Sequence, residues 1–289
     1  MARIDVRKTY KLYIGGAFPR SESGHSYEVT DAGGKFVANA SLASRKDARD
    51  AVVAARKAFG GWSGRTAYNR AQIVYRIAEV MEDRRPQFVT AVRQAEGLTA
   101  ARAERVVDAA IDRLVWYAGW ADKLTQVVGN ANPVAGPYFN LSTPEPTGVV
   151  AVLAPQESSL LGLVSVVAPV IVTGNTAVVV SSYERPLPAV NFAEVLATSD
   201  VPGGVVNILT GAAPTIGPWL ASHMDVNAID LAGVAGDAAL ATDLEVAAAD
   251  NLKRVRRAPA AEPDWNAEPP LTAMTDFVEI KTVWHPIGV

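Results

Sequence analysis

Hydrophobic residues change their pattern midway along the chain. From residue 148 onward, short apolar runs bounded by turn residues alternate with segments of helical length. This alternation is typical of an α/β fold, a Rossmann-type parallel sheet with helices on both faces. The pattern predicts strands at 149–153, 177–180, 205–209 and 229–231, a candidate fifth strand at 253–257, and helices at 160–173, 186–198, 214–223 and 235–249.

The first half has the spacing of amphipathic helices instead. Ser44 stands three residues before Asp47, which is the spacing of a capping box and predicts a helix start. Two longer patterns, with apolar residues every three or four positions, predict helices over 67–94 and 100–124. Pro86 is expected to break or kink the first of these two helices.

The C-terminal part shows neither of these two hydrophobic patterns. Residues 258–274 are proline-rich, with Pro259, Pro263, Pro269 and Pro270 close together, and are expected to be a linker. Residues 275–289 are expected to carry a lone strand, with one apolar face that packs down. The face in question consists of Val278, Ile280, Thr282 and Trp284. A lone strand needs a sheet from elsewhere, so we expect it to pair with another chain; the alternative is pairing with residues 138–146 of its own chain.

Composition narrows the class of protein. Hydrophobic residues make up 49% and charged residues 20% of the 289 residues, which is a globular composition. The net charge is −3, so no basic surface is expected to attract nucleic acid. The longest apolar run, Leu163 to Val172, is too short to cross a bilayer, and the first residues lack an apolar signal core. We therefore expect no membrane contact and a cytoplasmic location.

The sequence contains no cysteine, which excludes disulfides, thiolate metal ligands and a cysteine nucleophile. The three histidines, His25, His223 and His285, have no metal-ligand spacing. No metal site is therefore expected.

An open parallel sheet favours a nucleotide site at the carboxyl ends of its strands. The chain has neither the G-x-G-x-x-G fingerprint nor a P-loop. Four serines after the first two strands lack a neighbouring base, so we expect turn or cap roles for Ser158, Ser159, Ser181 and Ser182. Glu157 follows the first strand and is either a functional carboxylate or a solvated turn residue, the second being favoured. No catalytic residue is predicted.

Several segments, taken in order, add to this interpretation: KLYIGGAFPRSESG, AARKAFGGWS, GVVAVLAP, GNTAVVVSSYERPLPA, VPGGVVNILTG, ASHMDVNAIDLAG and NLKRV. From Lys11 to Val255 the chain resembles the aldehyde dehydrogenase superfamily, and FVEIKTVW is similar to that family's C-terminal strand. The resemblance implies a nicotinamide-binding domain over residues 1–257, with a β-hairpin oligomerisation arm inserted at about 125–147. It also implies a C-terminal oligomerisation strand and a catalytic domain with a cysteine nucleophile.

The chain departs from the family at its catalytic positions. It continues from NLKRV through the linker directly to FVEIKTVW. The family's catalytic domain, which lies between these two segments, has no counterpart in this sequence. Where the family has P-W-N, whose Asn donates to the developing oxyanion, this chain has Pro155, Gln156 and Glu157. An ionised carboxylate cannot donate. Alignment without gaps places Ala258 where the family has its general-base Glu.

The cofactor positions implied by the resemblance also differ. In the ribose-holding K-P-x-E pattern, Val180 replaces the Lys and Tyr183 the Glu. The phosphate-side F-T-G-S is Leu-Ala-Gly-Val at 231–234, and the second Gly of P-G-F-G is Ala213. We expect no bound cofactor, or NAD or NADP if any. The vestigial cofactor-binding positions are predicted to be Pro155, Gly211 and Gly233.

Three functions follow from this interpretation. The favoured one is a non-catalytic subunit, similar to the degenerate second half of two-domain aldehyde dehydrogenases, which assembles with an active full-length relative or with itself. The second is an NAD(P)-binding regulator. The third is an aldehyde oxidoreductase that is active only in a hetero-oligomer.

Overall fold

A parallel sheet of five strands, in the order β10-β9-β6-β7-β8, forms the centre of the computed structural model, which describes residues 7–288. The strands are β6 (Val149–Leu153), β7 (Thr176–Val180), β8 (Val206–Leu209), β9 (Ala228–Asp230) and β10 (Arg254–Arg256). All five predicted strands are present, and the α/β class is confirmed. Residues 1–6 and 289, which belong to the first and last predicted segments, lie outside the described residues.

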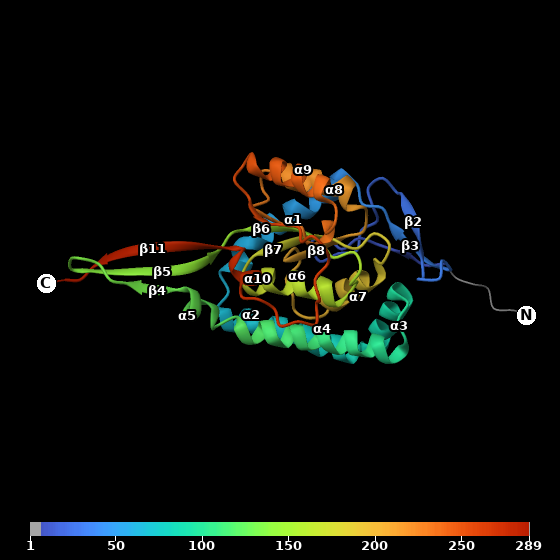
Figure 1. Cartoon of the computed structure of the whole chain (residues 1–289), viewed down its shortest axis with the longest axis horizontal. Helices are drawn as coiled ribbons and strands as arrows, with labels where there is room; N and C mark the ends of the chain where they lie inside the picture. Colours follow the sequence, from blue (N-terminus) through green and yellow to red (C-terminus); the bar gives the residue numbers. More distant parts are fainter. Residues whose placement is uncertain (1–6, 289) are drawn as a thin grey trace, which may run out of the picture.

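Helices cover both faces of this sheet (Figure 1). Alternate residues of β6 point to opposite layers: Val150 and Val152 join one apolar cluster, and Val149 and Ala151 join the other. The first layer contains α2 (Ala67–Asp83), α3 (Arg85–Glu96), α4 (Ala100–Trp120), α6 (Leu161–Val172) and α7 (Leu187–Leu196). The second contains α1 (Arg45–Ser63), α8 (Ala213–Ser222) and α9 (Ala238–Ala249).

Local sequence signals explain where several helices begin and end. The Ser44 side chain accepts hydrogen bonds from the Lys46 and Asp47 backbone N–H groups, and the Asp47 carboxylate accepts from the Ser44 N–H. This is the predicted capping box at the start of α1. The helix predicted over 67–94 is broken between α2 and α3, where Pro86 occupies the first turn of α3. Proline is tolerated there because its missing N–H would have no partner.

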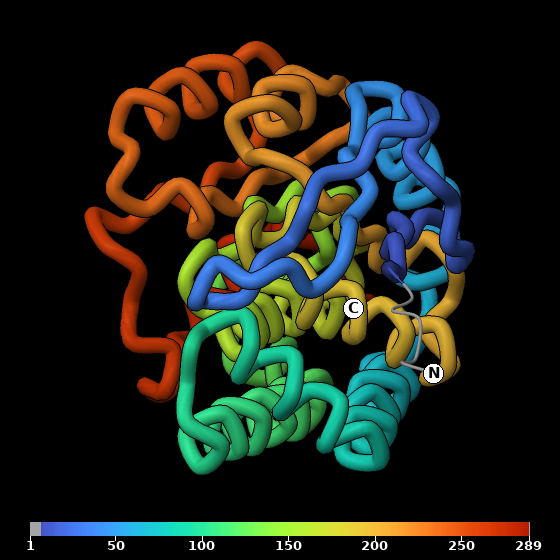
Figure 2. The backbone as a smooth tube through the Cα atoms, turned by 90° about the vertical axis from the view of Figure 1, so that its right-hand side faces the viewer, coloured from blue at the N-terminus to red at the C-terminus, as the bar shows by residue number. Residues whose placement is uncertain are grey.

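An N-terminal sheet lies across the carboxyl ends of the central strands (Figure 2). It consists of β1 (Thr9–Tyr10), β2 (Ser26–Thr30) and β3 (Phe36–Ser41), in the order β1-β3-β2. The Ala43 N–H donates to the Thr210 carbonyl just after β8, which fixes the end of β3 against the central sheet.

A narrow three-stranded arm extends from the opposite end of the body (Figure 1). It contains β4 (Asn130–Asn132), β5 (Tyr138–Pro146) and β11 (Val278–Pro286), in the order β11-β5-β4, and α5 (Leu124–Val128) lies at its base. The segment predicted as an arm, about 125–147, therefore forms a hairpin. Strand β11 adds a third strand to it.

The C-terminal strand differs from its prediction in two respects. It pairs antiparallel with β5 of its own chain along its whole length, which is the alternative we had favoured less. Its apolar face does not pack down as predicted: Val278 is buried, but Ile280 and Trp284 are about half exposed, at 50% and 57%. The tail pairs within its own chain because the residues just before the strand hold it at the base of the arm. Met274 of α10 (Thr272–Thr275) and Phe277 are fully buried there.

The proline-rich segment is held against the body rather than hanging free. We call residues 258–271 the strap. The buried Arg113 of α4 donates to the Trp265 and Ala267 carbonyls at 2.7 and 2.9 Å. The Glu262 carboxylate accepts from the Glu157 and Ser158 N–H groups at 2.9 and 2.8 Å. Composition indicated a linker, but these contacts give the strap a defined path along one flank of the molecule (Figure 2).

Candidate functional site

The carboxyl ends of the central strands enclose a cavity of about 420 Å³. Open parallel sheets bind ligands at this edge, so it is the first candidate for a functional site. Loops after β6, β7 and β8, the short helix η1 (Ala232–Val234) and the N-termini of α8 and α9 form its walls. Its lining residues are Gln156, Glu157, Ser182, Tyr183, Glu184, Ala212, Ala213, Pro214, Gly233, Val234, Ala235, Asp237 and Leu240.

The loop after β6 is held by its own polar groups. The Gln156 amide donates to the Ala154 carbonyl at 2.7 Å and accepts from the Tyr183 N–H at 3.1 Å, so it ties two loops together. The Glu157 carboxylate pairs with Arg185 at 2.6 Å, and its side chain is 72% exposed. This matches the solvated turn carboxylate that we favoured. An ionised Glu157 offers no proton to an oxyanion.

Tyr183 lines the cavity and stacks on Tyr27 of β2, which is not itself a lining residue. The two rings stack with centroids 4.6 Å apart. Burial, and to a smaller degree the neighbouring Tyr183, raises the pKa of the Tyr27 hydroxyl above its ordinary value. The Tyr27 ring is therefore neutral at physiological pH, and Tyr183 presents an aromatic ring to the cavity.

The charge of the cavity does not suit a dinucleotide. Among the described residues that line it, the charged side chains are Glu157, Glu184 and Asp237, all carboxylates. The N-terminus of α9 is already capped, because the Asp237 carboxylate accepts from the Leu240 N–H at 3.0 Å. A pyrophosphate would need cations or free N–H groups at such a helix start. The lining residues therefore offer a pyrophosphate no cation, and the Leu240 N–H at the start of α9 is already bonded.

Only one of the three predicted cofactor positions lines the cavity. Gly233 lines the cavity. An added Cβ there would come within 2.1 Å of the Ala154 carbonyl oxygen, so the close approach of η1 to β6 requires glycine. Gly211 has φ +155° and faces Ile216, and the buried Pro155 packs against Gly162. Neither Gly211 nor Pro155 is among the residues lining the cavity, and packing accounts for all three positions.

Other positions singled out by the sequence are structural. Val180 is fully buried in the core, and Ala258 packs against the same apolar cluster. Two of the serines have the predicted turn or cap role: the Ser158 hydroxyl accepts from the Gly162 N–H, and the Ser182 hydroxyl accepts from the Arg185 N–H. Within residues 7–288, no group of His, Asp and Glu is arranged to hold a metal ion.

Two carboxylates that sequence reasoning missed hold the loop before α6. Glu262 of the strap accepts from the N–H groups of residues 157 and 158. Glu96, at the end of α3, accepts from the Ser159 N–H at 2.8 Å and its hydroxyl at 2.7 Å. Burial raises the pKa of Glu96, and the two bonds from Ser159 oppose that rise. No spacing in the sequence indicated these contacts, whereas Asp237 directly before a helical pattern is a cap signal that could have been recognised.

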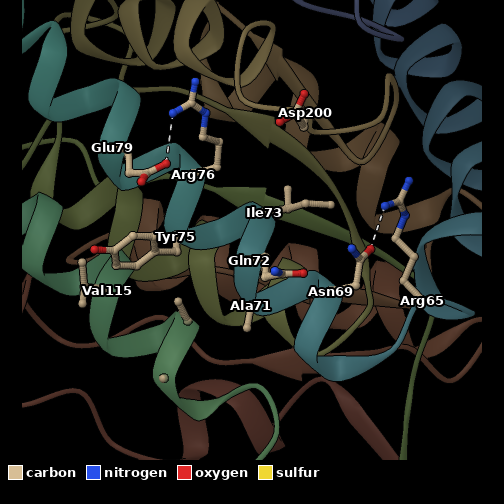
Figure 3. A pocket seen from close by; sticks show the side chains of 12 residues that line it. Arg65, Asn69, Ala71, Gln72, Ile73, Tyr75, Arg76, Glu79, Val115 and Asp200 are labelled. Atoms are coloured by element: carbon tan, nitrogen blue, oxygen red, sulfur yellow. Dashed lines mark hydrogen bonds and ion pairs between the residues drawn. The ribbon is translucent and has the colours of Figure 1, made fainter.

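A second, larger depression of about 870 Å³ lies over α2 and α4, away from the strand ends (Figure 3). Its polar side chains pair with one another: Arg76 with Glu79 at 3.0 Å, and Arg65 with Asn69 at 2.7 Å. Tyr75 and Val115 leave apolar surface between these pairs. The depression has no cluster of convergent polar groups, so the strand-end cavity remains the better candidate.

The chain is similar in sequence and in fold to proteins of one family. The family model described as "Aldehyde dehydrogenase family" matches residues 18–257. "Aldehyde dehydrogenase, cytosolic 1" of Elephantulus edwardii is 32% identical over 260 residues, which are 88% of this chain and 51% of that protein. Human "Cytosolic 10-formyltetrahydrofolate dehydrogenase" is 33% identical over 236 residues, 79% of this chain and 26% of that protein.

The NAD+ complex of aldehyde dehydrogenase from Bacillus cereus has a similar fold, with a TM-score of 0.80 and 26% identity over 86% of this chain and 50% of that one. The chain thus spans about half the length, or less, of these relatives. None of the helices in the described residues is long and apolar enough to cross a membrane.

Proposed function

Because the chain belongs to the aldehyde dehydrogenase family, we propose that it is a non-catalytic member that assembles with an active full-length relative. The single observation that carries this proposal is the contrast between the two ends of the central sheet. At the strand-end cavity Gln156, Glu157 and Asp237 are bonded within the chain, whereas the arm at the opposite end exposes apolar side chains and an unpaired strand edge.

Three features argue against catalysis by this chain. Its 289 residues contain no cysteine, so the covalent step implied by the resemblance has no nucleophile. Glu157 stands at the oxyanion-donor position and pairs with Arg185. Ala258 stands at the general-base position and is packed against the core. Because such groups act as a unit, restoring one of them should restore no activity.

Assembly is favoured by the surface of the arm. Phe139, Leu141 and Val283 point to the same face of the arm sheet and are 57%, 49% and 45% exposed. Contiguous exposed apolar residues on a projecting element are typical of protein–protein interfaces. The resemblance assigns this arm to subunit contacts. We further propose a cytoplasmic location, in line with relatives whose names describe them as cytosolic.

A regulator that binds NAD(P) is a second candidate, favoured by the persistence of a cavity of about 420 Å³ where the fold binds ligands. Its carboxylate lining weighs against it. An oxidoreductase that is active only in a hetero-oligomer would need its catalytic groups from the other subunit.

The test is co-expression with a full-length aldehyde dehydrogenase of the same organism, followed by affinity purification through a tag on this chain. We expect the two chains to elute together in one peak. The variant Phe139→Lys, on the arm, should reduce the amount of co-purified relative. Tyr68→Lys, at a 66% exposed position on α2, should not. Failure of the relative to co-purify, or equal loss with both variants, would contradict the proposal.

A further inference from the structure

A groove of about 330 Å³ lies between the first turns of α1 and the last turns of α8, two helices that pack against each other (Figure 1). We call it the α1–α8 groove, which is lined chiefly by Arg45, Ala48, Arg49, Trp219, Leu220 and Met224. Its volume is at the lower end of the range for small-molecule sites. The charged side chains that line it are both arginines, whereas those of the strand-end cavity are all carboxylates. The groove is therefore suited to an anion.

Arg45 carries the charge that a ligand would meet. Its guanidinium carbon lies 3.2 Å from the centroid of the Trp219 ring, a cation–π contact that holds the charge in place. Within residues 7–288 the Arg45 side chain forms no ion pair and no hydrogen bond with a protein group. The neighbouring Arg49, in contrast, donates to the Asp50 carboxylate from Nε and Nη2 at 3.0 and 2.8 Å. The Arg45 guanidinium therefore keeps its donors for a ligand.

The rest of the groove offers mainly apolar surface. Ala48 and Leu220 are 2% and 1% exposed and belong to one core cluster, so they give the groove a packed floor. Trp219 and Met224 are 39% and 71% exposed. A ligand with an apolar body would remove part of this area from water. The flexible methionine side chain can adapt to the shape of such a body.

Hydrogen bonds from other elements hold the groove in shape. The Arg56 side chain of α1 donates to the Asp225 carbonyl, and the Asn251 amide donates to the Met224 carbonyl at 3.1 Å, so the loop after α8 is fixed. His223 also lines the groove, and its Nδ1 accepts from the Asp225 N–H at 3.1 Å. Burial lowers the pKa of His223, so its ring is neutral at physiological pH. A preformed site loses little conformational freedom on binding.

We propose that the α1–α8 groove binds a small organic monoanion, a carboxylate attached to an apolar body. The carboxylate accepts hydrogen bonds from the Arg45 guanidinium, and the body lies against Trp219, Leu220 and Met224. A guanidinium and a carboxylate are complementary in geometry and in charge. A polyphosphate would bring several negative charges to a groove whose second arginine is already paired with Asp50, so it fits less well.

Isothermal titration calorimetry of the purified full chain, with hydrocinnamate as the probe, tests this proposal. We expect a Kd below about 1 mM, which a ligand of this size reaches in a preformed site. Hydrocinnamamide has the same body without the charge and should bind at least about tenfold more weakly. Acetate has the charge without the body and should show no binding at the same concentration.

Variants in the first turn of α1 assign the binding to Arg45. Arg45→Gln should weaken hydrocinnamate binding at least about tenfold, and Arg45→Lys should do so by less, because lysine keeps the charge but not the planar fork. Lys46→Gln is the matched control, since it removes the adjacent charge, which is paired with Glu22 at 3.1 Å and does not line the groove. Its Kd should equal that of the unmodified chain.

Nuclear magnetic resonance gives a second measurement that does not depend on Arg45 variants. The indole N–H signal of Trp219, identified by its loss in Trp219→Phe, should shift during titration of the unmodified chain and yield the same Kd. Absence of heat and of this shift at ten times the expected Kd overturns the proposal. Equal binding of the amide, or equal loss in Arg45→Gln and Lys46→Gln, also overturns it. Because no relative is present, these results are independent of hetero-assembly.

Discussion

The central sheet and the arm are both held by hydrogen bonds between backbone strands, but the side chains are buried in the central sheet and mostly exposed on the arm. Every residue of β6 and β7 is buried, whereas β11 is exposed beyond Val278 and β5 buries only Asn140. Most of the apolar area that stabilises the fold is therefore removed from water in the body. We therefore expect the arm to contribute little to stability.

The two regions also differ in how they satisfy polar groups. At the strand ends, Gln156, Asp237 and Glu262 accept from the N–H groups of Tyr183, Leu240 and Glu157. On the arm, the outward backbone groups of β11 have no described partner. The comparison teaches that the strand ends bond their polar groups within the chain, whereas the arm leaves a strand edge and apolar side chains exposed.

The largest difference in unfolding free energy is expected between two variants, one that breaks an ion pair in the body and one that breaks an ion pair in the arm. Arg256→Met leaves Asp230, which is 0% exposed, without its partner at 3.3 Å, and should cost about 3–5 kcal/mol of unfolding free energy. Lys281→Met breaks the exposed pair with Glu145 on the arm and should cost less than about 1 kcal/mol. Urea denaturation of both variants at neutral pH measures this difference, and equal losses would contradict the division between body and arm.

The stability of the Arg256→Met variant should depend on pH in a defined direction. Burial raises the pKa of Asp230, and Arg256 opposes that rise. Without Arg256 the folded chain takes up a proton on Asp230 at a higher pH than the unfolded chain does. The stability lost at neutral pH should therefore be partly regained as the pH falls through the acid range. A loss that stays constant with pH would contradict a buried, ionised Asp230.

A matched pair of leucines sharpens the comparison. Leu153→Ala, in β6, removes a fully buried side chain and should cost about 2–5 kcal/mol. Leu141→Ala, in β5, removes a side chain that is 49% exposed and should stay within about 0.5 kcal/mol. Thermal denaturation monitored by circular dichroism measures the loss of stability in each variant. A large loss for Leu141→Ala would mean that the arm shares the stability of the body.

A smaller and local effect is expected at the strap. Glu262→Gln removes the charge that accepts from the N–H groups of Glu157 and Ser158, and should cost about 1–2 kcal/mol. Amide hydrogen exchange should become faster at residues 157 and 158. Glu268→Gln, an exposed change in the same strap, should alter neither quantity. Unchanged exchange in Glu262→Gln would mean that the strap does not hold this loop.

The smallest expected effect is that of cofactor on the unmodified chain. Millimolar NAD or NADP should not raise the melting temperature, because the cavity presents carboxylates to the phosphates. A ligand at a hundred times its Kd would add about 2.7 kcal/mol, which thermal denaturation detects easily. A clear increase with either dinucleotide would favour the regulator instead.

Local signals in the sequence account for most of the fold. The buried strands were predicted from runs such as Val149–Leu153, and the start of α1 from Ser44 and Asp47, because periodicity and capping act over a few residues. The strap and the tail could not be predicted in this way. Their paths depend on Arg113, Met274 and Phe277, which contact residues far away in the sequence.

The candidate site was predicted less well than the fold. Its location followed from the sheet topology, and the resemblance placed Val180 and Tyr183 where the family has charged cofactor residues. Pro155 and Gly211 were identified by resemblance but do not line the cavity. The carboxylate of Glu262 reaches the site from 105 positions along the chain, a contact that only the three-dimensional structure reveals.

The claim that this chain is non-catalytic can be tested most directly by an activity assay of the purified protein before and after treatment with iodoacetamide. The chain has no cysteine, so alkylation of thiols cannot inactivate it, whereas a contaminating enzyme with a cysteine nucleophile would lose its activity. We expect no formation of NADH or NADPH from aldehydes, and any trace of activity should disappear on alkylation. Aldehyde oxidation that resists alkylation and increases in proportion to this chain would contradict the claim.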